Sequence, residues 1–116
     1  MLPRNYKLKK KNDFKGVFEK GRYFQGKFIK IKFLKNDLES SRFGLMVGLK
    51  VSKKAVERNK IKRWLEESIQ SNLEKIKNGF DVIIMVNPEI LERKYQEVKE
   101  ELINLLEESN LIVRWI

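Results

Sequence analysis

The sequence predicts an α+β fold: a single domain over residues 1–116, built as a two-layer sandwich with helices packed on a small mixed sheet. Three observations carry this prediction. Apolar residues recur at helical spacing in three segments, whereas residues 28–33 alternate strictly, as in a strand. The longest apolar run, residues 82–86, has the length of a buried strand. The chain is long enough for one hydrophobic core but not for two.

A short helix is predicted near the amino terminus. Residues 1–11 are basic and are expected to be mobile. Asn12 or Asp13 can then cap a helix over residues 13–20, which Gly21 ends. The apolar side chains of this helix share one face: Phe14, Val17 and Phe18.

Two strands joined by a hairpin are expected next. Residues 23–35 are predicted as one strand because of their alternation. One face carries Ile29, Ile31 and Phe33, and the other carries Phe28, Lys30 and Lys32. Turn-forming residues at 36–41 then reverse the chain into a returning strand over residues 43–49.

The second half of the chain predicts a helix, a strand and a helix. These elements are a helix from residue 53 to about residue 77, a strand over residues 81–86, and a helix from Pro88 to about residue 108. Ser52 is the expected cap of the first helix, Asn78 and Gly79 close it, and Asn87 caps the second. The apolar tail, residues 111–116, fits either a short strand or packing on the core.

Charge is unevenly distributed along the chain. Residues 1–63 carry 20 basic and 5 acidic side chains, a net of +15, and residues 64–116 carry 6 basic and 11 acidic, a net of −5, which together give the overall +10. Such polarisation indicates nucleic-acid binding. An anionic membrane surface is the weaker alternative, because the basic segments lack an amphipathic partner face rich in Leu and Trp.

The missing residue types exclude several classes of function. The chain has no cysteine and no histidine, so it has no disulfide, no imidazole base and none of the usual zinc ligands. Glu66 and Glu67 are adjacent on a helix and diverge by about 100°, which argues against a shared metal. We therefore expect no catalytic residue, no metal site and no small-molecule substrate. No apolar run approaches a membrane span, and the lack of cysteine fits a cytoplasmic location.

The run over residues 53–63, KKAVERNKIKR, is the strongest candidate binding surface. Six of its 11 residues are basic, and they stand where a helix is predicted to begin. Lys53 and Lys54 in a first turn would oppose the helix macrodipole by roughly a few tenths of a kcal/mol each. A polyanionic partner would explain this placement better than fold stability does.

A helical wheel separates this run into two sides. Asn59, Lys60 and Arg63 point away from the apolar side, Lys62 lies on the flank, and Arg58 projects nearer the apolar side. The apolar side consists of Ile61, Trp64, Leu65, Ile69 and Ile76. The alternative interpretation is a solvated face with no ligand.

A second candidate surface combines Phe14 and Phe18 with the lysine face of the first long strand, Lys30 and Lys32. Aromatic rings beside lysines on a sheet can stack single-stranded bases while the lysines neutralise phosphates. Phenylalanines four residues apart usually belong to the core, however, and the residues alone favour that interpretation.

Four stretches of the chain resemble the bacterial ribonuclease P protein component. Residues 58–63, RNKIKR, resemble the RNR signature of that family. The other matches are LKKKNDFKGVFEKG at residues 8–21, FGLMVGLKVSKK at residues 43–54 and GFDVIIMVNP at residues 79–88. The chain departs from the family at Lys60, where Arg is usual, and at Glu66, where Arg is frequent. The link between Lys54 and Arg58 is also shorter than the usual glycine-containing one.

The resemblance implies a left-handed βαβ crossover, against the general preference for right-handed ones. It also implies the protein subunit of ribonuclease P, the endoribonuclease that removes the 5′ leader of precursor tRNA. In that family the catalytic centre and its Mg²⁺ ions belong to the RNA, so the protein itself would bind no cofactor. Its partners would be ribonuclease P RNA and the precursor leader, with no membrane.

Site residues follow from the resemblance by position. The residues expected to dock on the catalytic RNA are Lys53, Lys54, Arg58, Asn59, Lys60, Lys62 and Arg63. Phe14 and Phe18 fall on the leader cleft, and Lys30 and Lys32 join them by inference from strand alternation. A ribosomal or RNA-chaperone protein with no role in cleavage is the alternative function. A protein-only nuclease is disfavoured by the missing histidine and the lack of clustered carboxylates.

Overall fold

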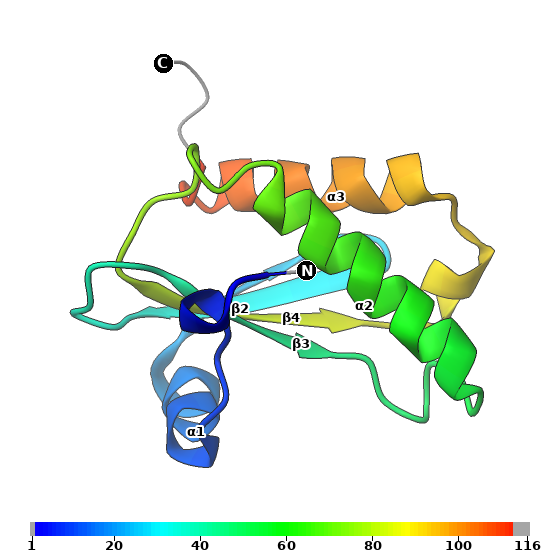
Figure 1. Ribbon diagram of the computed structural model, residues 1–116, viewed down its shortest axis with the longest axis horizontal. Helices are drawn as coiled ribbons and strands as arrows, with labels where there is room; N and C mark the ends of the chain where they lie inside the picture. Colours follow the sequence, from blue (N-terminus) through cyan, green and yellow to red (C-terminus); the bar gives the residue numbers. More distant parts are fainter. Residues whose placement is uncertain (1, 113–116) are drawn as a thin grey trace.

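A four-stranded sheet forms the centre of the structure, a computed structural model that describes residues 2–112 (Figure 1). Its strands are β1 (Arg22–Gln25), β2 (Ile29–Lys35), β3 (Arg42–Met46) and β4 (Phe80–Val86). Their spatial order is β1-β2-β4-β3. β2 runs antiparallel to both of its neighbours, and β3 runs parallel to β4. The sheet is therefore mixed, as predicted.

The strand pairing differs from the predicted hairpin. The region predicted as one strand, residues 23–35, is two strands, β1 and β2, which form a hairpin in which Arg22 lies opposite Phe33. β2 and β3 are not neighbours, because β4 lies between them. The apolar run of β4 is fully buried over residues 82–84. A strand buried on both faces needs hydrogen-bond partners on both edges, so it takes a central position.

The connection from β3 to β4 is a βαβ unit through α2 (Ala55–Gln70). In Figure 1 both strands point the same way, and α2 crosses in front of the sheet as the chain passes from one to the other. This arrangement makes the crossover left-handed, as the family resemblance implied. It also places the amino-terminal end of α2 beyond the carboxyl end of β3.

The helices cover the two faces of the sheet unequally. α2 and α3 (Tyr95–Glu108) form one layer and enclose the main core, which includes Ile31, Ile61 and Leu102, each with no exposed surface. α1 (Lys11–Lys20) packs on the opposite face through a smaller cluster around Val17 and Ile83. The predicted sandwich therefore has an additional helix on its second face (Figure 1).

Alternation along β2 sorts its side chains as predicted, with one exception. Ile29, Ile31 and Phe33 are buried in the main core, and Lys30 and Lys32 lie on the α1 face, half-buried. Phe28, predicted on the lysine face, lies instead in the main core. It precedes the first residue of β2, so strand alternation does not apply to it.

The first two helices begin or end away from their predicted bounds. α1 begins at Lys11, so Asn12 and Asp13 lie within its first turn and cap nothing. α2 begins at Ala55 rather than residue 53 and ends at Gln70 rather than near residue 77. Beyond that end, Ser71 Oγ and Asn72 Nδ2 both donate to the Ser68 carbonyl. Such side-chain bonds compete with helix propagation.

The predicted last helix is two helices, a 3₁₀ turn over Pro88–Glu92 and α3. Asn87 caps the first as predicted, since its Oδ1 accepts the backbone N–H of Glu89 at 3.1 Å. The break falls at extended residues Arg93 and Lys94. The backbone N–H of Lys94 donates to Glu97 Oε1, which helps α3 to start anew.

The amino-terminal segment, predicted to be mobile, contacts the rest of the domain through Leu2 and Leu8. Leu2 is buried, and its backbone N–H donates to Glu66 Oε2 at 3.0 Å. Leu8 is buried as well and donates to the Phe43 carbonyl at 2.9 Å. These contacts attach the segment to the domain at Leu2 and Leu8. They also give Glu66, an acid where the family often has Arg, a structural partner.

Only the first two residues of the predicted tail are described. Leu111 and Ile112 are buried, and Ile112 forms an isolated bridge with Ile76. Residues 113–116 lie outside the described part of the chain. Within residues 2–112, no helix has the length and apolar character that a membrane crossing requires.

Candidate nucleic-acid interface

The basic surface, defined as the seven residues expected to dock on RNA, lies on the β3–α2 loop and the first half of α2. Lys53 and Lys54 precede the helix instead of occupying its first turn. The first turn contains Glu57, whose carboxylate accepts the Ser52 hydroxyl. Ser52 Oγ in turn accepts the backbone N–H of Lys54 at 3.1 Å. The predicted placement of the two lysines in the first turn is therefore wrong, and the case for a polyanion depends on exposure.

Exposure along α2 agrees with the helical wheel. Asn59, Lys60 and Arg63 are exposed, while Arg58 and Lys62 are half-buried. On the other side of the helix, Ile61, Leu65 and Ile69 have no exposed surface. The half-buried position of Arg58 has a cause, because its Nη1 donates to the Ser52 carbonyl at 3.0 Å. Arg58 therefore also closes the loop that carries the two lysines.

The cations of the basic surface have no acidic partner within residues 2–112. No ion pair of that part of the chain includes Lys53, Lys54, Arg58, Lys60, Lys62 or Arg63. Lys60 differs, because its Nζ lies 4.8 Å from the centroid of the Trp64 ring. A cation–π contact at an exposed site is worth only about 0.5–1 kcal/mol. The surface is therefore a set of solvated cations available to phosphates.

The second candidate surface is assembled across α1 and β2. We call Phe14, Phe18, Lys30 and Lys32 the aromatic–lysine surface; all four lie on the sheet face that α1 only partly covers. Lys32 joins the two elements, because its ammonium lies 5.9 Å from the Phe18 ring centroid and donates to the Phe18 carbonyl. Lys30 lies on the same face two residues earlier along β2.

The two phenylalanines differ in their surroundings. Phe14 packs on the small cluster, and a Cβ added at Gly44 would approach its Cζ to 2.5 Å. Phe18 is 37% exposed. The core interpretation therefore applies in part to Phe14, whereas Phe18 presents its ring to solvent.

Two methionines extend the same face and were missed by sequence reasoning. Strand register places Lys30, Met85 and Met46 in one row across β2, β4 and β3. Met46 is 43% exposed and Met85 is half-buried. Polarisable, flexible methionines suit adaptable contact surfaces. Only the order of the strands shows that these methionines share a row with Lys30, and the predicted hairpin gave that order wrongly.

A cavity of about 210 Å³ lies between the two surfaces, beside the edge strand β3. Lys62 of the basic surface and Phe14 of the aromatic–lysine surface both line it. Two further lysines, Lys7 and Lys9, reach it from the amino-terminal segment. Three lysines and one acid, Glu66, thus line the region that separates the two surfaces.

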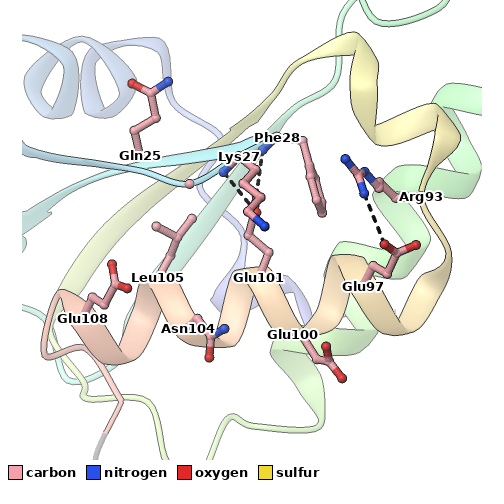
Figure 2. Close-up of a pocket in the computed structure, with 11 residues that line it drawn as sticks. Gln25, Lys27, Phe28, Arg93, Glu97, Glu100, Glu101, Asn104, Leu105 and Glu108 are labelled. Carbon is pink, nitrogen blue, oxygen red and sulfur yellow. Dashed lines mark hydrogen bonds and ion pairs between the residues drawn. The ribbon is translucent and has the colours of Figure 1, made fainter.

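A cavity of about 470 Å³ lies elsewhere, between the β1–β2 turn and α3 (Figure 2). Its lining includes Glu97, Glu100, Glu101 and Glu108, so it would repel phosphates. The Glu101 carboxylate accepts three successive backbone N–H groups, from Lys27, Phe28 and Ile29, at 2.7–3.0 Å. This contact ties the hairpin turn to α3.

Hydrogen bonding to Lys94 also shapes the acidic side. The Lys94 backbone N–H holds the pKa of the Glu97 carboxyl below its usual value, with the Arg93 side chain contributing. Glu97 is thus held as an anion at the start of α3. The nucleic-acid candidates therefore lie on the other surfaces.

Comparison with known proteins identifies the family. The family model described as Ribonuclease P matches residues 2–110. The ribonuclease P protein component of Alkaliphilus metalliredigens is 37% identical over 108 residues, covering 93% of this chain and 96% of that protein. That of Thermotoga maritima is 35% identical over 107 residues, covering 89% and 91%.

Solved structures agree with this result. The ribonuclease P protein from Thermotoga maritima superposes with a TM-score of 0.81 at 33% identity, covering 88% of this chain and 96% of that one. The Staphylococcus aureus ribonuclease P protein gives a TM-score of 0.86 over 93% and 98%, and at 24% identity it supports the fold alone. The chain therefore belongs to the ribonuclease P protein family.

Proposed function

We propose that this chain docks on the catalytic RNA of ribonuclease P through the basic surface and holds the 5′ leader of precursor tRNA on the aromatic–lysine surface. One observation carries the proposal: all six cations of the basic surface are without an acidic partner within residues 2–112. A folded domain gains little stability from such clustering. The clustering does favour binding of a polyanion, because the bound cations release counterions from the phosphates.

The docking step follows from the chemistry of the side chains. Arg63 offers a planar fork to a phosphate, and the lysines offer point charges. Asn59 adds an amide that can donate to and accept from sugar or base edges. Lys60 must leave or share the Trp64 ring to reach a phosphate, at a cost of about 0.5–1 kcal/mol.

The leader step uses the partly open face of the sheet. A single-stranded base can stack on the exposed Phe18 ring, and Lys30 and Lys32 can neutralise the adjoining phosphates. Met46 and Met85 add flexible apolar contacts beside them. Such contacts read the backbone and the faces of bases, so they tolerate different leader sequences.

The chemistry of cleavage is assigned to the RNA partner and its Mg²⁺ ions. The absence of histidine and cysteine from the chain supports this assignment. The subunit would then contribute substrate affinity and charge neutralisation in the cytoplasm, binding no cofactor itself. Charge neutralisation by a protein predicts a lower magnesium requirement for the assembled particle.

Reconstitution tests the proposal. The chain is added to a bacterial ribonuclease P RNA at limiting magnesium, and cleavage of precursor tRNA is measured. We expect a gain in cleavage that Lys53→Ala, Lys54→Ala and Arg63→Ala together remove. The matched control is Lys27→Ala, Lys75→Ala and Lys77→Ala, which removes the same charge from exposed residues outside both surfaces. No gain with the unaltered chain would refute the proposal.

An RNA chaperone with no role in cleavage has a similar charge distribution, and the same experiment separates it. A chaperone would bind the RNA and also lose affinity in the triple variant. Cleavage at limiting magnesium would not rise. Because the chain belongs to the ribonuclease P protein family, we expect the first result.

A further inference from the structure

One ion-pair network joins α1 to the sheet. Arg42 of β3 lies between two carboxylates: its Nη1 is 3.3 Å from Asp13 Oδ2 of α1, and its Nη2 is 2.7 Å from Asp81 Oδ2 of β4. Within residues 2–112, Asp13–Arg42 is the single ion pair between α1 and any other element. The other contacts of α1 with the sheet are the apolar ones around Val17 and the hydrogen bond from Lys32 Nζ to the Phe18 carbonyl.

The sheet side of this network is rigid. Asp81 is 6% exposed and accepts two hydrogen bonds from Arg42, through Nε at 2.8 Å and Nη2 at 2.7 Å. Asn36 Nδ2 donates to the same carboxylate at 2.8 Å. The hydrogen bond to Asp81 also raises the pKa of Arg42, which keeps the guanidinium charged. Asp13 therefore meets a cation that cannot move far.

The α1 side carries the aromatic rings. Asp13 directly precedes Phe14 and lies five residues before Phe18 in the same helix. Apolar packing around Val17 is non-directional and fixes the orientation of the helix less sharply than a polar contact does. Two charge-assisted contacts have specific geometry: Lys32 with the Phe18 carbonyl at the carboxyl end of α1, and Arg42 with Asp13 at its amino end.

We propose that Arg42 is a positioning residue: by holding Asp13, it sets the angle of α1 on the sheet and thereby places the Phe18 ring beside Lys30 and Lys32. This inference rests on the proposed leader-binding role of the aromatic–lysine surface. Arg42 acts through α1, and it contacts no leader nucleotide itself. Asp13 and Arg42 are separated by 29 positions in the sequence, and the contact exists because β3 lies at the edge beside β4.

A swap of neighbouring residues isolates the ion pair. Asn12→Asp combined with Asp13→Asn keeps the composition, the net charge and an acid in the first turn of α1. It turns the carboxylate by about 100° around the helix, away from Arg42. The buried Arg42–Asp81 pair stays intact, so the fold is not at risk from an unpaired buried charge.

The measurement is the leader contribution to binding. Holoenzyme reconstituted from this chain and a bacterial ribonuclease P RNA is titrated with precursor tRNA and with leaderless tRNA. We expect the swap to reduce the ratio of the two affinities by about twofold to tenfold, while affinities for leaderless tRNA and for the RNA subunit stay unchanged. The control variant Asp13→Glu keeps a carboxylate at position 13, so it should retain most of the affinity ratio of the unaltered chain.

A second readout is independent of RNA. Nuclear Overhauser contacts between the Phe18 ring and the Lys32 side chain should weaken in the free swap variant, because α1 has shifted. A variant with normal contacts and a normal leader contribution would overturn the inference.

Phe18→Ala separates this inference from the proposed function. If Phe18→Ala lowers the leader contribution and the swap does not, Arg42 has no positioning role and the leader surface stands. If Phe18→Ala leaves the leader contribution unchanged, the leader surface itself is wrong. In that case the proposed positioning role of Arg42 in leader binding is wrong as well.

Discussion

The two faces of the sheet use the same strands for different purposes. Along β2, Ile29, Ile31 and Phe33 are buried under α2 and α3, whereas Lys30 and Lys32 lie on the partly open face beside α1. The first face encloses the main core and holds the fold together. The second leaves Phe18 and Met46 exposed, at 37% and 43%. A shift of one residue along a strand therefore separates a stabilising side chain from one available to a ligand.

The largest expected effect contrasts neighbouring residues of β2. Ile31→Ala should lower the free energy of unfolding by about 2–5 kcal/mol, because a fully buried side chain leaves a cavity. Lys32→Ala should lower it by less than about 1 kcal/mol. Urea unfolding of the two variants measures both values. Equal losses would contradict the division of the sheet into two faces.

The next prediction contrasts two phenylalanines. Phe33→Ala, at 5% exposure in the main core, should cost about 3–5 kcal/mol of stability. Phe18→Ala should cost clearly less because its ring is partly solvated, and it should instead weaken precursor-tRNA binding by about 1–3 kcal/mol per stacked base. Urea unfolding and titration with precursor tRNA check the two parts. Normal leader affinity in a folded Phe18→Ala protein would remove Phe18 from the interface.

The basic surface permits a smaller test that depends on salt. Arg63→Ala should shallow the slope of log affinity against log salt by about one unit and change stability by less than about 0.5 kcal/mol. The control is Lys75→Ala, also exposed but beyond the end of α2. Arg58→Ala is less clean, since it also removes the hydrogen bond to the Ser52 carbonyl. An unchanged slope for Arg63→Ala would show that this side chain contacts no phosphate.

The smallest effect concerns the acidic side of the molecule. Because hydrogen bonding to the Lys94 backbone lowers the pKa of Glu97 in the folded state, its carboxylate stabilises the fold above the unfolded pKa of about 4.5. That contribution should disappear as the pH falls through the lower folded-state pKa. Unfolding of the wild type and of Glu97→Gln, followed from about pH 6 to about pH 3, should show the two stabilities converging in acid. Parallel curves would contradict the assignment.

Local patterns predicted the local features of this protein well. The 3.6-residue period located α2 and its buried side, and it sorted Asn59, Lys60 and Arg63 to the outside. Helix ends were less predictable. The sequence does not show whether the Ser68 carbonyl will accept the side chains of Ser71 and Asn72, as it does in the fold, or continue the helix. The capping role of Asn87 was predictable, since it involves a backbone group only two residues away.

Sequence alone determined the class of the fold, the helical and extended segments, the polarity of the charge and the family resemblance, since all of these reside in neighbouring residues. Only the tertiary structure decided that β4 lies between β2 and β3, that α1 packs on the second face, and that Arg42 meets Asp13. Strand order and cross-sheet ion pairs depend on contacts between residues far apart in the chain, and no local period encodes them. The basic surface depends on both: its composition is local, and the absence of acidic partners among residues 2–112 is a property of the fold.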